Sequence, residues 1–557
     1  MKRLIMILCL LSAPLFGATI EVATEGDLQA MHDNPSSNFV LTADILMSDT
    51  NFASYVILDP DMTFDLDGHT IDGLYASSGS WARSCMFGEC DANGKTVVIK
   101  NGTMTNFFFK ATGGGRIGLI AYFTGTDSSL TFTNMHIHMT TSGAGSYVGT
   151  VGQGYRDITF VDSTIAVTHT NTGSGIYVGP LVGNSGATLI GDNLNITMTY
   201  VDAGSAASYI GAVCGRYQLG SAALTDSTIT GYLNADAASD YVALMGAAVN
   251  GTSIPILISN CVFSGNVIVD DWGGGILGLA SATGGSTIRD CTLRDFTLET
   301  TGLSGGVMNY VYVNDVIQGC TVSNVVFIGG GGGIAGAGAG GHIIGNTVID
   351  CTFTNAGNVG GLVYKWPSTG GASTTEQNRV IGLKVYNVTA AGGIGYLDNL
   401  AAAVIRDNYV ADISFLGTGD VGGAFYRQNA GVIERNWVTG TAVSGADCGG
   451  FIYWQPGGTI SNCIADVTGA DYEFAHLKSG IQTNNAVVQQ GIDAYQSGGT
   501  VQWEEDAISD FYDADHGVYD PWDFATPIWY EWDDRLPRFT EQPADATATW
   551  RRRYMIR

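Results

Sequence analysis

The chain has few basic residues and few charged residues of any kind. Lys and Arg together number 24 against 52 Asp and Glu, the formal net charge is −28, and charged residues make up only 14% of the 557 positions. A charge of this sign repels the phosphates of nucleic acids and anionic membrane surfaces, so we expect neither as a partner. Two interpretations of the acidity stay open: carboxylate rows that bind an acidic polysaccharide through Ca²⁺, or a means of keeping a glycine-rich chain soluble.

Long apolar runs are missing beyond the N-terminus. Lys2 and Arg3 precede an apolar stretch from Leu4 to Phe16 and two small residues. This pattern is typical of a secretory signal peptide, which we assign to residues 1–18. No later stretch offers about 18 continuous apolar residues, so we expect a mature chain without a transmembrane segment, secreted or held at the cell surface.

Sustained helical periodicity is also missing, and a repeat takes its place. Twelve times, an Asx or small residue and a second small residue precede an alternating apolar strand, at a mean interval of about 30 residues. A second phrase keeps step with the first, built on Tyr-Val-Gly in early copies and on Gly-Gly pairs in later ones. Intervals of this length are typical of solenoids, and short runs of β-branched and aromatic residues predict strands. We therefore predict an all-β fold, a right-handed parallel β-helix of about twelve repeats with N- and C-terminal caps.

The repeat also predicts where segments and special residues lie. The predicted segments are the signal peptide (1–18), an N-terminal cap with the first coils (19–110), the solenoid repeats (111–470), a last coil or connector (471–500), and a Trp- and Asp-rich cap with a basic tail (501–557). We expect the 78 glycines mostly at corners and close coil contacts. The Asx residue before each anchor is expected to cap a left-handed turn.

Five cysteines occupy the anchor position of the repeat. They are Cys261, Cys291, Cys320, Cys351 and Cys463. We expect one interior column of free thiols, because parallel side chains on stacked coils lie near the long limit for a disulfide. Among the other cysteines, Cys85 and Cys90 are the best candidates for a disulfide bond.

Several motifs carry a family resemblance. They are FDLDGHTIDGL at 64–74, GGFIYWQPGGTISNC at 449–463, and YDPWDF, IW and LPRF within 519–539. In these motifs, and in its opening segment, the chain resembles the GLUG-motif repeat proteins, secreted bacterial β-solenoids with a pectin-lyase-like superfold. The resemblance implies a secreted or surface protein, of a kind often proposed to serve adhesion or binding, and it implies no single activity. Many coils here lack the family's Gly-Leu-Val-Gly motif, and the basic tail at 540–557 has no counterpart among the family's motifs.

Candidate catalytic residues come from an acidic stripe spaced near the repeat. Its members are Asp202, Asp236, Asp270, Asp271 and Glu299, of which the last three are the catalytic candidates. Carboxylates on neighbouring coils would suit a glycoside hydrolase, and Ca²⁺ with a nearby Arg289 or Arg294 would suit a lyase. The alternative is that these are ordinary surface residues of an acidic protein, since the chain has no Asn-Thr-Asp, Gly-His-Gly or Arg-Ile-Lys string of the polygalacturonase-like kind and no His-Glu-x-x-His motif. His136 and His138 share a strand face, but a third ligand is missing, so we predict no metal site there.

The C-terminal segment mixes aromatic residues with carboxylates. Its candidate binding residues are Trp503, Tyr512, Trp522, Trp529 and Trp532, and its candidate Ca²⁺ ligands are Asp513, Asp515 and Asp520. Exposed aromatic side chains beside carboxylates would bind sugars, whereas buried ones would close the open end of a solenoid. We expect the cap.

These features predict a secreted or cell-surface binding or adhesion scaffold. Its lateral face would recognise an extracellular glycan or a surface protein. The alternatives are a carbohydrate-active β-helix enzyme, either polysaccharide lyase or glycoside hydrolase, and a viral tail-type rod protein.

Overall fold

A computed structural model of the chain describes most residues between 19 and 488, together with three later strands. The gaps are 32–36, 49–60, 79–82, 92–93, 95, 125–126, 145, 174–175, 203–208, 219, 236–240, 248–254, 271, 280–284, 339, 356, 367–370, 398–401, 418, 473, 479 and 484, and the later described ranges are 503–506, 529–532 and 535–539. The chain divides into two compact units, Met1–Asp315 and Val316–Arg557. The boundary falls inside the predicted repeat region.

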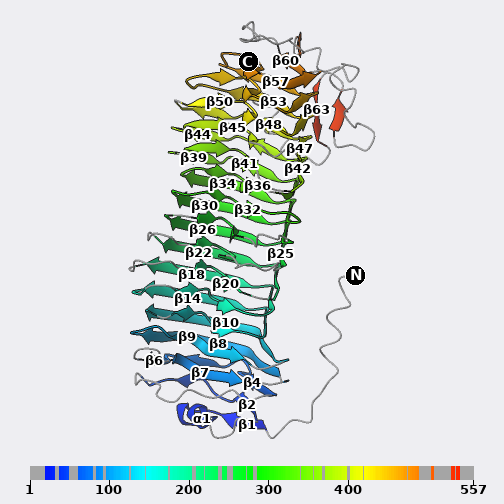
Figure 1. Cartoon of the computed structure of the whole chain (residues 1–557). Helices are drawn as coiled ribbons and strands as arrows, with labels where there is room; N and C mark the ends of the chain where they lie inside the picture. The colour runs from blue at the N-terminus through cyan, green and yellow to red at the C-terminus, as the bar shows by residue number, and fades with distance from the viewer. Residues whose placement is uncertain are drawn as a thin grey trace. The chain divides into compact units, whose positions relative to one another are not determined.

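Both units are built as a right-handed parallel β-solenoid, with about 11 turns in all (Figure 1). Each turn contributes strands to two sheets, here called sheet A and sheet B, and each strand pairs in parallel with its equivalent in the next turn. This confirms the predicted fold class. It also explains the repeat, because a residue about 30 positions on lies in the same column of side chains.

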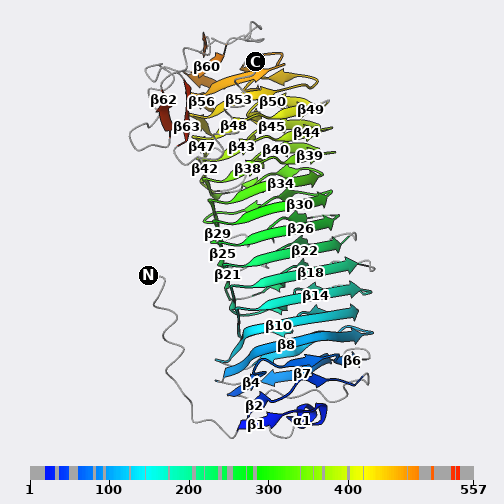
Figure 2. The same ribbon diagram turned by 180° about the vertical axis from the view of Figure 1, so that it is seen from behind.

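In unit 1, sheet A holds the longer strands, which run side by side in Figure 2. They are β1 (Thr19–Val22), β2 (Asn38–Leu41), β3 (Ile45–Leu46), β4 (Met62–Asp65), β5 (Thr70–Asp72), β6 (Tyr75–Ser78), β8 (Thr96–Ala111), β10 (Ser129–Gly143), β13 (Asp157–Val161), β14 (Thr164–Asn171), β17 (Leu189–Asp192), β18 (Asn195–Asp202), β21 (Ala222–Thr225), β22 (Thr228–Ala235), β25 (Ile256–Ser259), β26 (Val262–Val269), β29 (Thr287–Arg289) and β30 (Thr292–Thr300). Sheet B comprises β7 (Arg83–Asp91), β9 (Arg116–Thr124), β11 (Tyr147–Val148), β12 (Val151–Gly154), β15 (Tyr177–Val178), β16 (Val182–Ser185), β19 (Tyr209–Gly211), β20 (Cys214–Tyr217), β23 (Tyr241–Ala243), β24 (Gly246–Ala247), β27 (Trp272–Gly274), β28 (Leu277–Leu279), β31 (Ser304–Gly305) and β32 (Met308–Val311).

Unit 2 follows the same plan. Its sheet A comprises β33 (Val316–Gln318), β34 (Thr321–Ile328), β37 (Gly341–Ile344), β38 (Thr347–Ile349), β39 (Thr352–Thr354), β42 (Ser373–Glu376), β43 (Arg379–Ile381), β44 (Lys384–Tyr386), β47 (Ala403–Arg406), β48 (Tyr409–Ala411), β49 (Ser414–Leu416), β52 (Val432–Glu434), β53 (Trp437–Ala442), β56 (Thr459–Ser461), β57 (Ile464–Thr468), β59 (Ile481–Thr483), β60 (Asn485–Val488) and β61 (Trp503–Asp506). Its sheet B comprises β35 (Gly331–Gly332), β36 (Ala335–Gly338), β40 (Asn358–Gly360), β41 (Val363–Trp366), β45 (Ala390–Gly392), β46 (Gly395–Leu397), β50 (Asp420–Gly422), β51 (Phe425–Gln428), β54 (Cys448–Gly449), β55 (Ile452–Gln455) and β58 (Ala475–Lys478). A separate antiparallel hairpin joins β62 (Trp529–Trp532) to β63 (Arg535–Phe539).

The strands alternate as the sequence predicts. In β14 the apolar residues Ile165 and Val167 are buried, and the intervening residues are partly exposed. Successive strand residues point to opposite faces, so every second side chain fills the interior of the coil. The interior is therefore built from columns of Val, Ile, Leu, Phe and Met.

The corners confirm the expected role of the Asx residues. Residues with left-handed φ values between 50° and 56° stand before the anchors, namely Asn134, Asp162, Asn193, Asp226, Asn260, Asp290, Asp350 and Asn462. Asn and Asp tolerate this conformation better than other non-glycine residues. Their side chains also bond from turn to turn, as where Asn193 Nδ2 donates to Asp162 Oδ1 over 2.6 Å.

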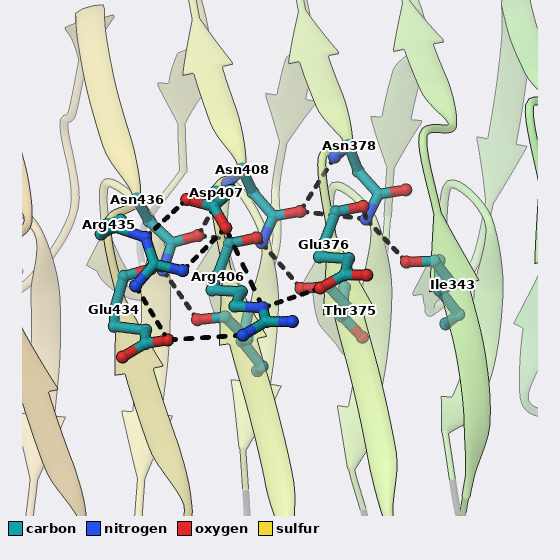
Figure 3. Close-up of polar contacts among 11 residues, drawn as sticks. Ile343, Thr375, Glu376, Asn378, Arg406, Asp407, Asn408, Glu434, Arg435 and Asn436 are labelled. Atoms are coloured by element: carbon teal, nitrogen blue, oxygen red, sulfur yellow. Dashed lines mark hydrogen bonds and ion pairs between the residues drawn. The ribbon is translucent and has the colours of Figure 1, made fainter. Parts of the chain in front are cut away.

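A ladder of buried asparagines runs through unit 2 and was not predicted. Asn346, Asn378, Asn408 and Asn436 stand in register, and each of the first three donates its Nδ2 to the Oδ1 of the next, over 2.8–3.0 Å. Figure 3 shows the last three of these asparagines. The backbone N–H of each also donates to that same oxygen. These amides give buried backbone groups at the corner a partner, which water would otherwise have to supply.

The predicted cysteine column needs correction. In unit 2, Cys320 and Cys463 lie in the column of the asparagine ladder, since Cys320 N donates to Asn346 Oδ1 and Asn436 N contacts Cys463 Sγ. Cys351 lies in the next column along, because β34 pairs with both β38 and β39 and places Val325 opposite it. An extra corner at Asp350 therefore shifts this thiol out of line.

The described cysteines are free and buried, as expected for the five anchor thiols. The predicted disulfide between Cys85 and Cys90 is wrong. Both residues lie in the single extended strand β7, five positions apart, so their Cα atoms are separated by about 16 Å, well beyond disulfide reach.

Helix is almost absent from the described residues. The helix α1 (Glu25–Ala30) starts at Thr24, whose hydroxyl accepts from Asp27 N, while the Asp27 carboxylate accepts from Thr24 N. This is a capping box, which stabilises a single short turn. None of the described helices has the length and apolar character that a membrane span requires.

Candidate functional site

Four tyrosines form a stacked ladder on sheet B of unit 1. Tyr147, Tyr177, Tyr209 and Tyr241 open β11, β15, β19 and β23 in register. Neighbouring ring centroids lie 5.2 Å apart and the ring planes are within 12° of parallel. The side chains are half-buried. Because each ring face is covered by the next ring, the ladder offers ring edges and hydroxyl groups to a ligand.

Arg116 precedes the tyrosines in the same column. Its guanidinium carbon lies 4.3 Å from the centroid of the Tyr122 ring and 5.7 Å from that of Tyr147. Its Nε donates to Gln153 Oε1 over 2.8 Å, and Gln153 Nε2 donates in turn to the Tyr155 hydroxyl over 2.7 Å. Stacking and hydrogen bonding therefore fix the direction of this cation.

Arg216 takes a similar place further along. Its guanidinium carbon lies 5.3 Å from the Tyr177 centroid and 5.4 Å from the Tyr209 centroid, and Nη1 donates to the Tyr177 hydroxyl over 3.0 Å. Burial raises the pKa of Tyr209, and Arg216 opposes that rise. Within the described part of the chain, Arg216 Nε and the Oδ1 of its register neighbour Asn184 are buried and make no hydrogen bond.

These two arginines have no carboxylate partner among the described residues, since the ion pairs found there involve other cations. This is unusual in a chain with 52 acidic and 24 basic residues. The surface formed by Arg116, Arg216 and the four tyrosines, called the tyrosine ladder below, therefore presents positive charge and hydrogen-bonding groups side by side.

The predicted acidic stripe does not line up among its described members. Register places Asp202 with Val269 and Thr300 in one column, whereas Glu299 shares a column with Val201 and Ile268. Asp270 follows Val269 and lies outside both columns. Asp202 Oδ1 accepts a hydrogen bond from Asn171 Nδ2 over 2.9 Å, which gives it a structural role. Asp236 and Asp271 lie outside the described residues.

The other predicted positions are placed only in part. His136 and His138 are exposed on one face of β10. Groups of three or more His, Cys, Asp or Glu side chains suited to a metal ion are not found in the part of the chain that the structure describes. Trp503 lies in β61, and Trp529 and Trp532 lie in β62, with only their backbone described. The five remaining candidates also lie outside the described residues: Tyr512, Asp513, Asp515, Asp520 and Trp522.

The sequence predicted that the four tyrosines recur with the repeat, but it did not predict that they form a binding surface. Their spacing of 30 to 32 residues matches the coil, which was signal enough to place them in one column. Arg116 precedes Tyr147 by 31 residues and carries the same signal, whereas Arg216 carries none, because it reaches its rings from another column. Comparison with known proteins adds nothing to this picture: no family model, curated protein or solved structure matches the chain.

Proposed function

We propose that the chain is a secreted or cell-surface binding protein for extended carbohydrate, with the tyrosine ladder as its contact surface. The observation that carries the proposal is the register of four tyrosines beside two arginines that lack carboxylate partners among the described residues. The N-terminal apolar stretch supports secretion. The GLUG-like motifs support the same class of function.

The geometry suits a linear sugar chain. Parallel strands stack about 4.8 Å apart, which is close to the length of one pyranose unit in an extended polysaccharide. Each turn would then offer one sugar a tyrosine edge and hydroxyl, with guanidinium and amide groups at intervals. A surface of many shallow polar contacts suits binding.

Glycan-array binding of the mature protein and its variants tests the proposal. Tyr177→Phe keeps the stacked ring and removes the hydroxyl that accepts from Arg216, and Arg216→Gln removes the cation. We expect the wild type to bind a linear glycan, Tyr177→Phe to bind about 3- to 10-fold more weakly and Arg216→Gln about 10-fold or more. Tyr232→Ser is the matched control, because Tyr232 is 53% exposed on sheet A, away from the ladder.

The proposal fails if no glycan binds at any concentration tested. It also fails if the ladder variants and Tyr232→Ser bind a glycan as well as the wild type.

A further inference from the structure

Unit 2 carries a different column on its sheet B, in which cations and aromatic rings alternate. Lys365, Tyr396, Arg427 and Trp454 stand in register across β41, β46, β51 and β55. The Lys365 Nζ lies 5.5 Å from the Tyr396 centroid. The Arg427 guanidinium carbon lies 4.0 Å from the Trp454 centroid and 5.9 Å from that of Tyr396. We call these four residues the cation–aromatic column.

The guanidinium of Arg427 is held in a fixed direction. Its plane is confined between Trp454 and Tyr396, and Nε donates to Asn429 Oδ1 over 2.7 Å. Among the described residues no carboxylate lies within 4.0 Å of it, and no protein acceptor takes the Nη1 and Nη2 hydrogens. The side chain is half-buried. The two terminal nitrogens therefore present a pair of parallel donors at the surface.

The arginines on sheet A of the same turns behave differently. Arg406 pairs with Glu376 over 2.7 Å, and Arg435 pairs with Asp407 over 2.8 Å and with Glu434 over 3.1 Å (Figure 3). In this acidic unit an arginine side chain readily finds a carboxylate on sheet A. Arg427 is instead surrounded by rings and an amide, an environment that positions a cation for an external anion.

Beside the column lies a second pair of rings. Tyr426 and Tyr453 stack with centroids 5.5 Å apart. Burial, and then the neighbouring Asp420 carboxylate, raise the pKa of Tyr453. A carboxylate at this edge accepts hydrogen bonds from hydroxyl groups and repels a second anion. The surface thus combines one anion-binding cation with neighbours that suit uncharged hydroxyls.

We propose that the cation–aromatic column binds an acidic saccharide, with the carboxylate of a uronic acid unit held by Arg427. A guanidinium edge matches a planar carboxylate by two parallel hydrogen bonds, which is the strongest recognition available to this side chain. The hydroxyls of the sugar ring and its neighbours then meet Tyr426 and Asp420, which are partly exposed beside the buried Tyr453. This site does not rest on the function proposed for the tyrosine ladder, which belongs to unit 1.

Isothermal titration with hexagalacturonate and with its carboxyl-reduced, neutral form tests the inference. We expect the wild type to prefer the charged oligomer, Arg427→Gln to bind it roughly 10- to 100-fold more weakly, and Arg427→Lys to fall between them because it keeps charge without the planar fork. Arg294→Gln is the matched control, since it removes one exposed sheet A arginine and the same charge. Circular dichroism melting confirms folding, and if Arg427→Gln does not fold, the Arg427→Lys comparison decides.

Four outcomes would overturn the inference. One is equal affinity of the wild type for the charged and the neutral oligomer. Another is an equal loss of affinity for the charged oligomer in Arg427→Gln and Arg294→Gln. A third is stronger Arg427-dependent binding of a sulfated oligosaccharide than of the uronate, which would make the ligand a sulfate. The fourth is loss of uronate binding in Arg216→Gln but not in Arg427→Gln, which would place the site in unit 1. Failure of neutral glycans to bind the tyrosine ladder would leave the result for Arg427 intact.

Discussion

His169 is a titratable side chain locked inside the coil of unit 1. It is fully buried between Thr141 and Tyr200 in one interior column, with Nδ1 2.8 Å from the Thr141 hydroxyl and its ring stacked on Tyr200 at 5.8 Å. Burial lowers the pKa of His169 from 6.5 to about 3. The folded protein therefore keeps the imidazole neutral at pH values where the unfolded chain protonates it.

Acidification should destabilise unit 1 through this residue. The unfolded state binds a proton below about pH 6.5 and the folded state only near pH 3, so the free energy of unfolding falls as the pH drops between these values. From pH 7 to pH 5 the loss is about 2 kcal/mol. In urea denaturation, the free energy of unfolding of the wild type, and of the exposed control His136→Gln, should fall by about this amount relative to that of His169→Gln between pH 7 and pH 5.

The buried carboxyl group of Asp315 adds a second pH dependence, so the effect of His169 has to be measured against His169→Gln. Burial raises its pKa from 3.8 to about 6, so its contribution to stability has the opposite sign and is lost as the pH rises through 6. The wild-type profile alone would mix the two effects. A pH dependence that is the same in His169→Gln and in the wild type would contradict the prediction.

The asparagine ladder makes Asn408 a sensitive position in unit 2. Its Nδ2 donates to Thr375 O and to Asn436 Oδ1, and its Oδ1 accepts from both nitrogens of Asn378. Asn408→Ala leaves these buried groups without partners and should lower the free energy of unfolding by roughly 2 to 5 kcal/mol. Asn408→Cys should cost less than Asn408→Asp, because a thiol already occupies this column at Cys463 and a carboxylate would be buried without a counter-charge.

Thermal melts followed by circular dichroism measure these differences. Asn195→Ala, at an exposed position of sheet A, is the control and should change the midpoint little. Equal midpoints for Asn408→Ala and Asn195→Ala would show that the ladder adds no stability.

At the scale of elements, the tight bends of sheet B depend on glycine. A Cβ built on Gly361 would lie 2.1 Å from the carbonyl oxygen of Gly393 in the next turn, whereas one on Gly357 meets nothing within 4 Å. Gly361→Ala should therefore lower the free energy of unfolding by about 1 to 3 kcal/mol, and Gly357→Ala should be close to neutral. The difference in urea midpoint between these two variants measures the effect, and no difference would contradict close packing of the turns.

The sequence predicted the strands and corners better than it predicted which side chains lie in one column from turn to turn. Alternating apolar residues and an Asx before each anchor are local signals, so the strands and the left-handed corners could be placed without a structure. Cys351 could not, because the extra corner at Asp350 looks in sequence like any other repeat start. The tyrosine ladder could be placed in one column, but the contacts of Arg116 with the Tyr122 ring of its own strand and of Arg216 with the Tyr177 ring of another turn come from side-chain packing, which spacing does not encode.

At the scale of the whole molecule, stability comes from stacking of turns without disulfide bonds among the described cysteines. The eight described thiols are buried, and burial raises the pKa of Cys85, Cys214, Cys351 and Cys463 to about 12. A buried thiol with a raised pKa reacts slowly, because the thiolate is the nucleophile. The native protein should therefore resist thiol reagents at these eight described cysteines.

Two measurements check this expectation together. A reducing agent should leave the thermal midpoint of the mature protein unchanged, because the described turns have no cross-link to lose. A thiol reagent such as dithionitrobenzoate should label few cysteines in the native state and at least the eight described thiols after denaturation. A midpoint that falls by several degrees on reduction would mean that a disulfide stabilises the fold, and rapid native labelling of eight thiols would mean that the coil interior opens to solvent.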